Sequence, residues 1–369
     1  MLNVFRSYKD KVQTQSFARV KRYWLSIAFV LGFVVDTITL NNVEQIFDNL
    51  VLLTHVLLSM TALFLMYAAA AGRVPEQWVV PLRKYAPLVA QYSFGGLLSG
   101  MLIFYGRSGA WTESWPFLII ILAVIAGNEI IKDRSARFLF NLTVLFVGLF
   151  AYLVLIIPVI SGYMGPLVFL GSGLLALLVM YGYIRLLQRV IPNFIKLQMR
   201  MLVFMIGIVF AGYNFLYFAN IIPPIPLSLK DVGIYHSVVK FDDGEYQLKY
   251  EEGAWWQFYK DSDTTFHPVA GGNIFCFASV FTPTRLHTDI YHTWEYYDEA
   301  SKKWVEHSRL SYSISGGRDG GYRGYTLIKN FRDGVWRCSV ETERGQVLGQ
   351  EKFTVDSSEP PAPLVTKTE

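Results

Sequence analysis

The chain has 369 residues, 53% of them apolar, and a net charge of +4. Residues 1–225 carry 17 Lys and Arg against 8 Asp and Glu, whereas residues 226–369 carry 16 against 21. The positive charge therefore belongs to the apolar N-terminal part, and a mildly acidic C-terminal part excludes a nucleic-acid-binding soluble domain, which would need a basic stripe.

Apolar runs recur from Trp24 to Ile221 and predict a seven-helix membrane bundle over residues 24–221. A run of about 20 residues matches the roughly 30 Å hydrocarbon core of a bilayer. We expect the first run to be a retained span, because no small-residue cleavage site follows the basic segment 1–23. The predicted spans are 24–42, 50–71, 87–106, 115–131, 138–160, 164–184 and 201–221.

The basic residues in the predicted loops indicate the orientation. The N-terminal segment and the second, fourth and sixth loops together hold sixteen Lys and Arg, and the other loops hold only Arg107. Short basic loops stay in the cytoplasm. The pattern predicts a bacterial inner-membrane protein with a cytoplasmic N-terminus and, after seven spans, a periplasmic C-terminal domain.

Three polar residues inside the predicted spans could form a site. Asp36, His55 and Asn214 each fall about 8 to 10 Å from the outer membrane face at 1.5 Å per residue. Intramembrane charges need partners, so the group is a candidate for a relay in a small transporter or proton-linked membrane enzyme. A structural hydrogen-bond cluster is the alternative. The nearby GLLSG (96–100) has the spacing of a helix-packing motif.

The prolines at 223 and 224 end the last span and open a connector, residues 222–232. From residue 233 the apolar pattern has period two, with turn signals such as DDG (242–244) between strands. These features predict an all-β, antiparallel sandwich-like domain over residues 233–356. The last residues, 357–369, have the composition of a disordered tail. The glycine-rich stretch 313–330 lacks Walker A spacing, so we expect it to be a turn.

A longer stretch, residues 292–355, resembles the bacterial family known as domain of unknown function 2914. The resemblance rests on a His-x-Trp strand (His292, Trp294), an aromatic–Arg pair after a glycine turn (Tyr322, Arg323) and later strands. Those later strands carry Trp336 and the closing Phe353 and Val355. The resemblance implies a domain that follows membrane spans in the same chain, and it implies no activity.

Several side chains of this domain are candidate site residues. Cys276 and Cys338 either form a disulfide across the domain or remain two buried thiols. Five histidines are scattered without metal-ligand spacing, so we expect no metal. Aromatic residues cluster in 253–261 and 291–297, where they either bind a sugar or partner or pack in the core.

The sequence carries no Gly-x-Ser-x-Gly, Walker A or HExxH motif, so an enzyme is not indicated and no cofactor is expected. The leading hypothesis is an envelope protein whose periplasmic domain binds a glycan or a protein through His292, Trp294, Tyr322 and Arg323. The alternatives are the intramembrane site at Asp36 and His55 and a purely structural membrane scaffold. The expected partners are the lipid bilayer and an envelope component, and the oligomeric state stays open.

Overall fold

The computed structural model describes residues 31, 34–40, 45–108, 111–130, 134–252, 261–269, 271–317 and 320–369. The chain divides into two compact units, one built of helices and one that contains the strands. Segment 1–23, most of the first predicted span and the aromatic stretch 253–260 fall outside the described residues.

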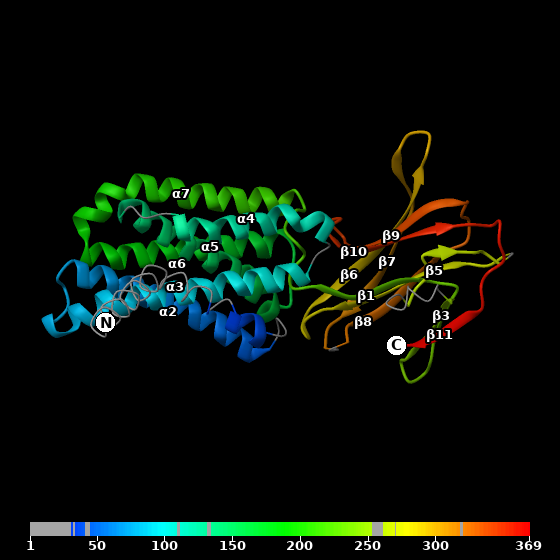
Figure 1. Ribbon diagram of the computed structural model, residues 1–369, viewed down its shortest axis with the longest axis horizontal. Helices are drawn as coiled ribbons and strands as arrows, with labels where there is room; N and C mark the ends of the chain where they lie inside the picture. The colour runs from blue at the N-terminus through cyan, green and yellow to red at the C-terminus, as the bar shows by residue number, and fades with distance from the viewer. Residues whose placement is uncertain are drawn as a thin grey trace, which may run out of the picture. The chain divides into compact units, whose positions relative to one another are not determined.

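The helices of the first unit run alongside one another (Figure 1). Residues 34–39 are helical. Both α6 and α7 begin on a proline, which suits the first helical turn because its missing N–H would have no partner there. The labelled helices are α2 (Ile46–Ala70), α3 (Glu76–Arg107), α4 (Trp111–Ile130), α5 (Arg134–Ser161), α6 (Pro166–Val190) and α7 (Pro192–Phe218).

Five of the described helices are long and apolar enough to cross a membrane: α2, α3, α5 from residue 137, α6 and α7. Within α4, the apolar stretch Trp115–Val124 is shorter. Of the first predicted span, 24–42, the structure describes only residues 31 and 34–40. The helices therefore indicate a membrane protein, and the count of seven spans stays a prediction.

The helical surface is apolar on the outside and partly polar inside. Leu167 and Leu197 are 84% and 81% exposed, as suits side chains that face lipid. In contrast, Ser99 and Ser172 are fully buried. Small residues allow close helix contacts, and a Cβ on Gly96 would overlap the ring of His55. The packing role predicted for GLLSG is confirmed.

Eleven labelled strands form three sheets in the second unit, in the orders β1-β5-β8, β4-β10-β9-β6-β7 and β11-β3-β2. The strands are β1 (Ser228–Tyr235), β2 (Ser237–Lys240), β3 (Tyr246–Glu251), β4 (Thr265–Phe266), β5 (Ile274–Phe281), β6 (His287–Asp298), β7 (Lys303–Ser315), β8 (Tyr322–Ile328), β9 (Gly334–Thr342), β10 (Val347–Val355) and β11 (Leu364–Thr368).

The core lies between the first two sheets. Cys276 of β5 and Ile328 of β8 pack with Trp294 of β6, Trp336 of β9 and Phe353 of β10 in one buried cluster. The alternation of apolar residues thus predicted the inner faces of β6 and β9 correctly. The all-antiparallel expectation fails at one point, because β4 pairs with β10 in parallel.

The predicted disordered tail is wrong for its last residues. Leu364–Thr368 forms β11, which pairs antiparallel with β3 from Leu364–Glu251 to Thr368–Gln247. The proline- and serine-rich residues before it suggested disorder, but the final alternation of Leu, Val and Thr suits a strand. Lys367 adds ion pairs to Asp231 and Asp261, so the strand is held by side chains as well as by backbone.

The glycine-rich stretch connects β7 in one sheet to β8 in another. Gly317 and Gly321 have positive φ angles of 103° and 87°, which glycine adopts without strain. Gly316 packs directly on the Pro283 carbonyl, where a side chain would clash. The stretch is a connection between sheets, in agreement with the predicted turn, although the sequence suggested a simpler strand reversal.

Candidate functional site

The His-x-Trp pair points into the core and not to the surface. His292 and Trp294 are both 0% exposed. The indole Nε1 of Trp294 donates to Thr326 Oγ1 at 3.0 Å, and His292 Nδ1 also lies 3.0 Å from that oxygen. Tyr312 Oη meets His292 Nε2 at 3.1 Å. The expectation that His292 and Trp294 contact a ligand is therefore wrong, because no ligand reaches them in the folded domain.

These four side chains form a satisfied polar network inside an apolar core, the form in which buried polar groups are tolerated. Burial lowers the pKa of His292 to about 3, so its ring is neutral. The alternation in β6 correctly put His292 and Trp294 on one face. It could not tell a core face from a binding face, because aromatic residues suit both.

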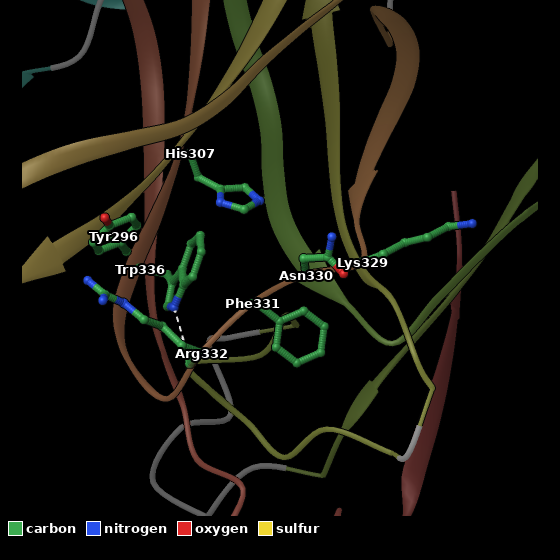
Figure 2. Close-up of a pocket in the computed structure, with 7 residues that line it drawn as sticks. All are labelled: Tyr296, His307, Lys329, Asn330, Phe331, Arg332 and Trp336. Atoms are coloured by element: carbon green, nitrogen blue, oxygen red, sulfur yellow. Dashed lines mark hydrogen bonds between the residues drawn. The ribbon is translucent and has the colours of Figure 1, made fainter.

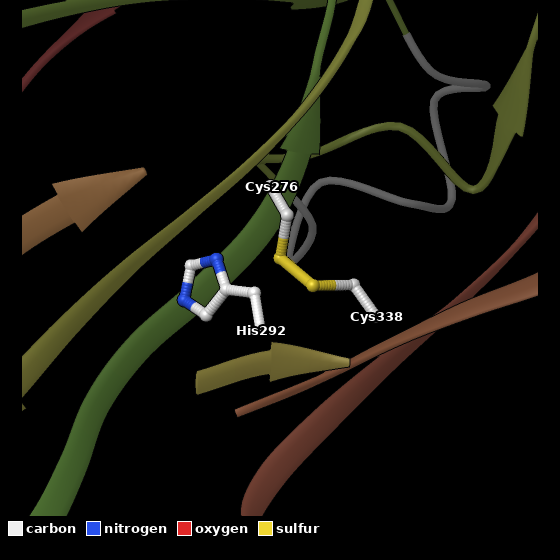
Figure 3. A group of neighbouring side chains, drawn as sticks. All are labelled: Cys276, His292 and Cys338. Atoms are coloured by element: carbon white, nitrogen blue, oxygen red, sulfur yellow. A yellow bond between two sulfur atoms is a disulfide. The ribbon is translucent and has the colours of Figure 1, made fainter. Parts of the chain in front are cut away.

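The two cysteines are joined. Cys276 of β5 and Cys338 of β9 form a disulfide that links two sheets, with Cα atoms 6.5 Å apart. Figure 3 shows the ring of His292 beside the two sulfurs. Two thiolates and an imidazole would resemble a zinc site, but the disulfide consumes the thiolates, and both ring nitrogens of His292 have hydrogen-bond partners. This cluster is structural.

The other predicted pair is split by the pleat of β8. Tyr322 packs against the core cluster that contains Ile290 and Ile314. The backbone carbonyl of Arg323 accepts a hydrogen bond from Tyr246 Oη at 3.3 Å. The side chain of Arg323 is half-buried. Tyr322 and Arg323 therefore face opposite sides, as alternation predicted, and no described contact joins either to His292.

A surface cleft of about 410 Å³ opens at the end of the five-stranded sheet (Figure 2). Its aromatic side chains come from neighbouring strands and from the β8–β9 connection, and its cations flank them. The residues that line it are Tyr296, His307, Lys329, Asn330, Phe331, Arg332 and Trp336.

Tilted and edge-to-face ring contacts give this cleft a defined shape. The Trp336 ring lies 5.5 Å from Tyr296 and 5.3 Å from His307, centre to centre. The guanidinium of Arg332 sits 3.7 Å above the Tyr296 ring, and its backbone carbonyl accepts a hydrogen bond from Trp336 Nε1 at 2.8 Å. Trp336 is the buried floor of the cleft, whereas His307, Lys329 and Arg332 are exposed.

The cleft combines the half-buried rings of Tyr296 and Phe331 with positive charge. Lys329 and Arg332 supply the cations, and Asp298 lies 3.9 Å from Arg332 as a weak counter-charge. Such a site suits a ligand that has an apolar face and an anionic group. The sequence analysis named Trp336 only for the family resemblance and Tyr296 only within the aromatic stretch 291–297, and it missed the cations. The basic and aromatic stretch 329–332, directly before the turn at 333–334, was the available signal.

A second candidate site lies within the helical unit. His55 Nε2 is 3.3 Å from the carboxylate of Asp36, and Ser99 Oγ is 3.2 Å from its other oxygen. Asp36 is 1% exposed and His55 is 4% exposed. The structure thus brings Asp36 and His55 together as predicted. Asn214 does not share a described contact with them, because its amide donates to Phe210 O on its own helix at 2.7 Å.

The fold defines a helical membrane protein that carries a β-sheet domain with an aromatic and basic cleft. Residues 287–355 match the family described as "Protein of unknown function (DUF2914)". The match confirms the resemblance of the C-terminal part, and it contains every residue of the cleft.

Comparison with curated proteins finds no significant match. Among solved structures, the chain is similar to Pseudomonas fluorescens alkylpurine DNA glycosylase AlkC bound to DNA containing an abasic site analog. The identity is 10%, the alignment covers 86% of this chain and 100% of that chain, and the TM-score is 0.19. A likeness this weak carries no argument about fold or function.

Proposed function

We propose that the protein is a bacterial inner-membrane protein whose C-terminal domain faces the periplasm and binds an anionic saccharide of the cell envelope. The observation that carries the proposal is the cleft in which Arg332 stacks on Tyr296 beside Trp336. Aromatic rings stack on the apolar faces of sugars, and the guanidinium of Arg pairs with a carboxylate or phosphate in a two-pronged geometry.

Two further observations support the periplasmic location. The N-terminal segment and the predicted loops on one side hold sixteen basic residues and the loops on the other side hold one, which favours a cytoplasmic N-terminus. The Cys276–Cys338 disulfide suits an oxidising compartment. A cytoplasmic N-terminus and a periplasmic C-terminal domain together require an odd number of spans, and the seven predicted spans meet this requirement.

We expect the double variant Lys329→Ala/Arg332→Ala to bind an anionic oligosaccharide at least about tenfold more weakly, because each charge-assisted hydrogen bond contributes about 1.5 to 3 kcal/mol. Binding of the purified full-length protein to uronate-containing oligosaccharides and to their neutral counterparts would be measured by calorimetry. Both side chains are exposed, so the variant should fold normally.

The matched control is Lys240→Ala/Arg285→Ala, which removes the same charge at exposed positions outside the cleft. Wild type and control should prefer the anionic saccharide equally. Equal affinity for neutral and anionic saccharides, or equal losses in the two double variants, would contradict the proposal. If both double variants still bind an envelope protein, the contact with that protein lies outside the cleft.

A second candidate function, proton-linked transport, is favoured by the contact of Asp36 with His55. A buried carboxylate beside an imidazole can pass a proton within a membrane, whereas a lone carboxylate there lacks a partner. The buried hydroxyl of Ser99 would hold the carboxylate in place. Proton flux under a membrane potential is the property that separates this function from a structural hydrogen-bond cluster.

We expect Asp36→Asn to lower proton flux into proteoliposomes at least about tenfold, since an amide accepts no proton at neutral pH. A pH-sensitive dye inside the vesicles would report the flux. Asn214→Ala is the matched control, because Asn214 bonds only within its own helix in the described contacts. If the proton flux into vesicles with the wild-type protein does not exceed the flux into protein-free vesicles, the contact of Asp36 with His55 has a purely structural role.

A further inference from the structure

Four titratable side chains meet in the β-domain, outside the cleft and outside the family match. His236 lies between β1 and β2, Glu251 ends β3, Asp263 precedes β4 and His267 follows it. His236 Nε2 is 2.8 Å from Glu251 Oε1 and 3.7 Å from Asp263 Oδ2. His267 Nδ1 is 2.7 Å from Glu251 Oε2. The cluster therefore joins segments that are separate in the chain.

The first three of these side chains are almost fully enclosed. The side-chain exposure of His236, Glu251 and Asp263 is 6%, 7% and 0%. Asp263 Oδ1 accepts the Glu251 N–H at 2.6 Å, but Asp263 Oδ2 has no hydrogen-bond partner among the described residues. A buried carboxylate oxygen without a partner is costly, and a proton or a cation relieves that cost.

The surrounding groups hold the three ligand atoms in position. Glu251 also accepts the backbone N–H groups of His267 at 2.8 Å and Ala362 at 3.1 Å. The ring of His236 stacks on Phe266 at 4.0 Å with an interplanar angle of 13°, which fixes the direction of Nε2. Such supporting hydrogen bonds and packing are typical of the shell around a metal site.

We propose that His236 Nε2, Glu251 and Asp263 Oδ2 bind one divalent transition-metal ion of the zinc class, with His267 as the residue that orients Glu251. The three donor atoms all lie within 4.8 Å of one another. Donors at about 2.0 to 2.2 Å from a tetrahedral zinc are about 3.3 to 3.6 Å apart, so the 2.8 Å and 3.7 Å distances from His236 Nε2 would each change by less than about 1 Å.

The donor set selects the class of metal. An imidazole nitrogen suits zinc and its neighbours, whereas calcium and magnesium prefer sites made of oxygen alone. Zinc would displace the proton of the hydrogen bond between His236 Nε2 and Glu251 Oε1 and would give Asp263 Oδ2 a cationic partner. Because the three protein ligands are almost fully enclosed, the ion would tie the β11-β3-β2 sheet to the segment before β4, and a water would complete its tetrahedral coordination.

The test uses full-length protein in detergent, without a polyhistidine tag, stripped with a chelator and then titrated with Zn²⁺. We expect about one tightly bound zinc per chain and a higher unfolding temperature with zinc, and no such effect of Mg²⁺. Asp263→Asn and His236→Gln should weaken zinc binding at least about 100-fold, and His267→Gln about tenfold. His287→Gln, which changes an exposed histidine, should leave it unchanged.

Cobalt gives a readout that does not depend on the variants. Co²⁺ bound to wild type should show the visible absorption of a four- or five-coordinate N/O site, without the thiolate band that the bonded cysteines cannot supply. The proposal is overturned if wild type binds zinc no more tightly than about 10 µM. It is also overturned if folded Asp263→Asn protein retains full affinity. Neither result depends on the saccharide cleft.

Discussion

Replacing Cys276 and Cys338 together by alanine should lower the free energy of unfolding of the β-domain by about 4 kcal/mol. The disulfide joins residues 62 positions apart. Closing a loop of about 60 residues in the unfolded chain removes chain entropy that corresponds to about 4 kcal/mol at 25 °C. The bond also lies between two sheets, so its loss frees β5 from β9 at the centre of the core.

Hydrogen exchange of the backbone amides in β5 and β9 of the full-length protein would measure this loss, because these strands open only on global unfolding. Wild type with a reducing agent should show the same exchange as the double variant, and the reducing agent should not change the variant further. A loss below about 1 kcal/mol would mean that the bond does not hold the two sheets together.

The sequence predicted strands such as β6 and β9 well because alternate residues of each are buried. A period of two, interrupted by turn residues such as Gly244 at φ 87°, determines which residues point inward. This pattern did not predict which strands pair with one another. The parallel β4–β10 contact joins Thr265 to Thr354, and the residues of such a short strand carry no signal of their own.

The helices followed from their apolar length, but their ends did not. The predicted span 87–106 corresponds to α3, which begins at Glu76 and includes Pro81 and Pro87. Proline normally marks the first turn of a helix or its end. The long helix here places the prolines inside, where only tertiary packing can compensate for their missing hydrogen bonds.

The candidate sites show the limits of sequence reasoning most clearly. Asp36 and His55 were paired correctly, because charged residues at one membrane depth need each other. In the β-domain, His236 and Glu251 are 15 positions apart and face each other only because the β2–β3 hairpin returns the chain. Their spacing matches no metal motif, so the three-dimensional arrangement was needed to find them.

His292 was taken for a contact residue since a histidine beside tryptophan is typical of binding surfaces as well as of cores. Its neighbour Thr326 lies in a different sheet, 34 positions away, and supplies the hydrogen bond that makes burial tolerable. The His-x-Trp pair of this chain is therefore explained by the stability of the core.

Lowering the pH from 6.5 to 4.5 should reduce the unfolding free energy of the β-domain by about 2 to 3 kcal/mol through His292 alone. Folding lowers the pKa of this ring from 6.5 to about 3, because burial excludes the charged form. Between those values the unfolded chain binds a proton that the folded domain does not, so acid favours unfolding by about 1.4 kcal/mol per pH unit. Well above pH 6.5 neither state binds the proton, and the contribution of His292 is constant.

The variant His292→Gln can still bond to Thr326 and Tyr312 but cannot titrate. Its unfolding free energy would be measured by hydrogen exchange with a chelator present. The unfolding of this variant should take up about one proton fewer than that of wild type, so its unfolding free energy should change less steeply with pH. His287→Gln, an exposed histidine, should keep the wild-type slope. The same slope in His292→Gln and wild type would show that the ring is not held neutral in the core, and the structural explanation of the His-x-Trp pair would then be wrong.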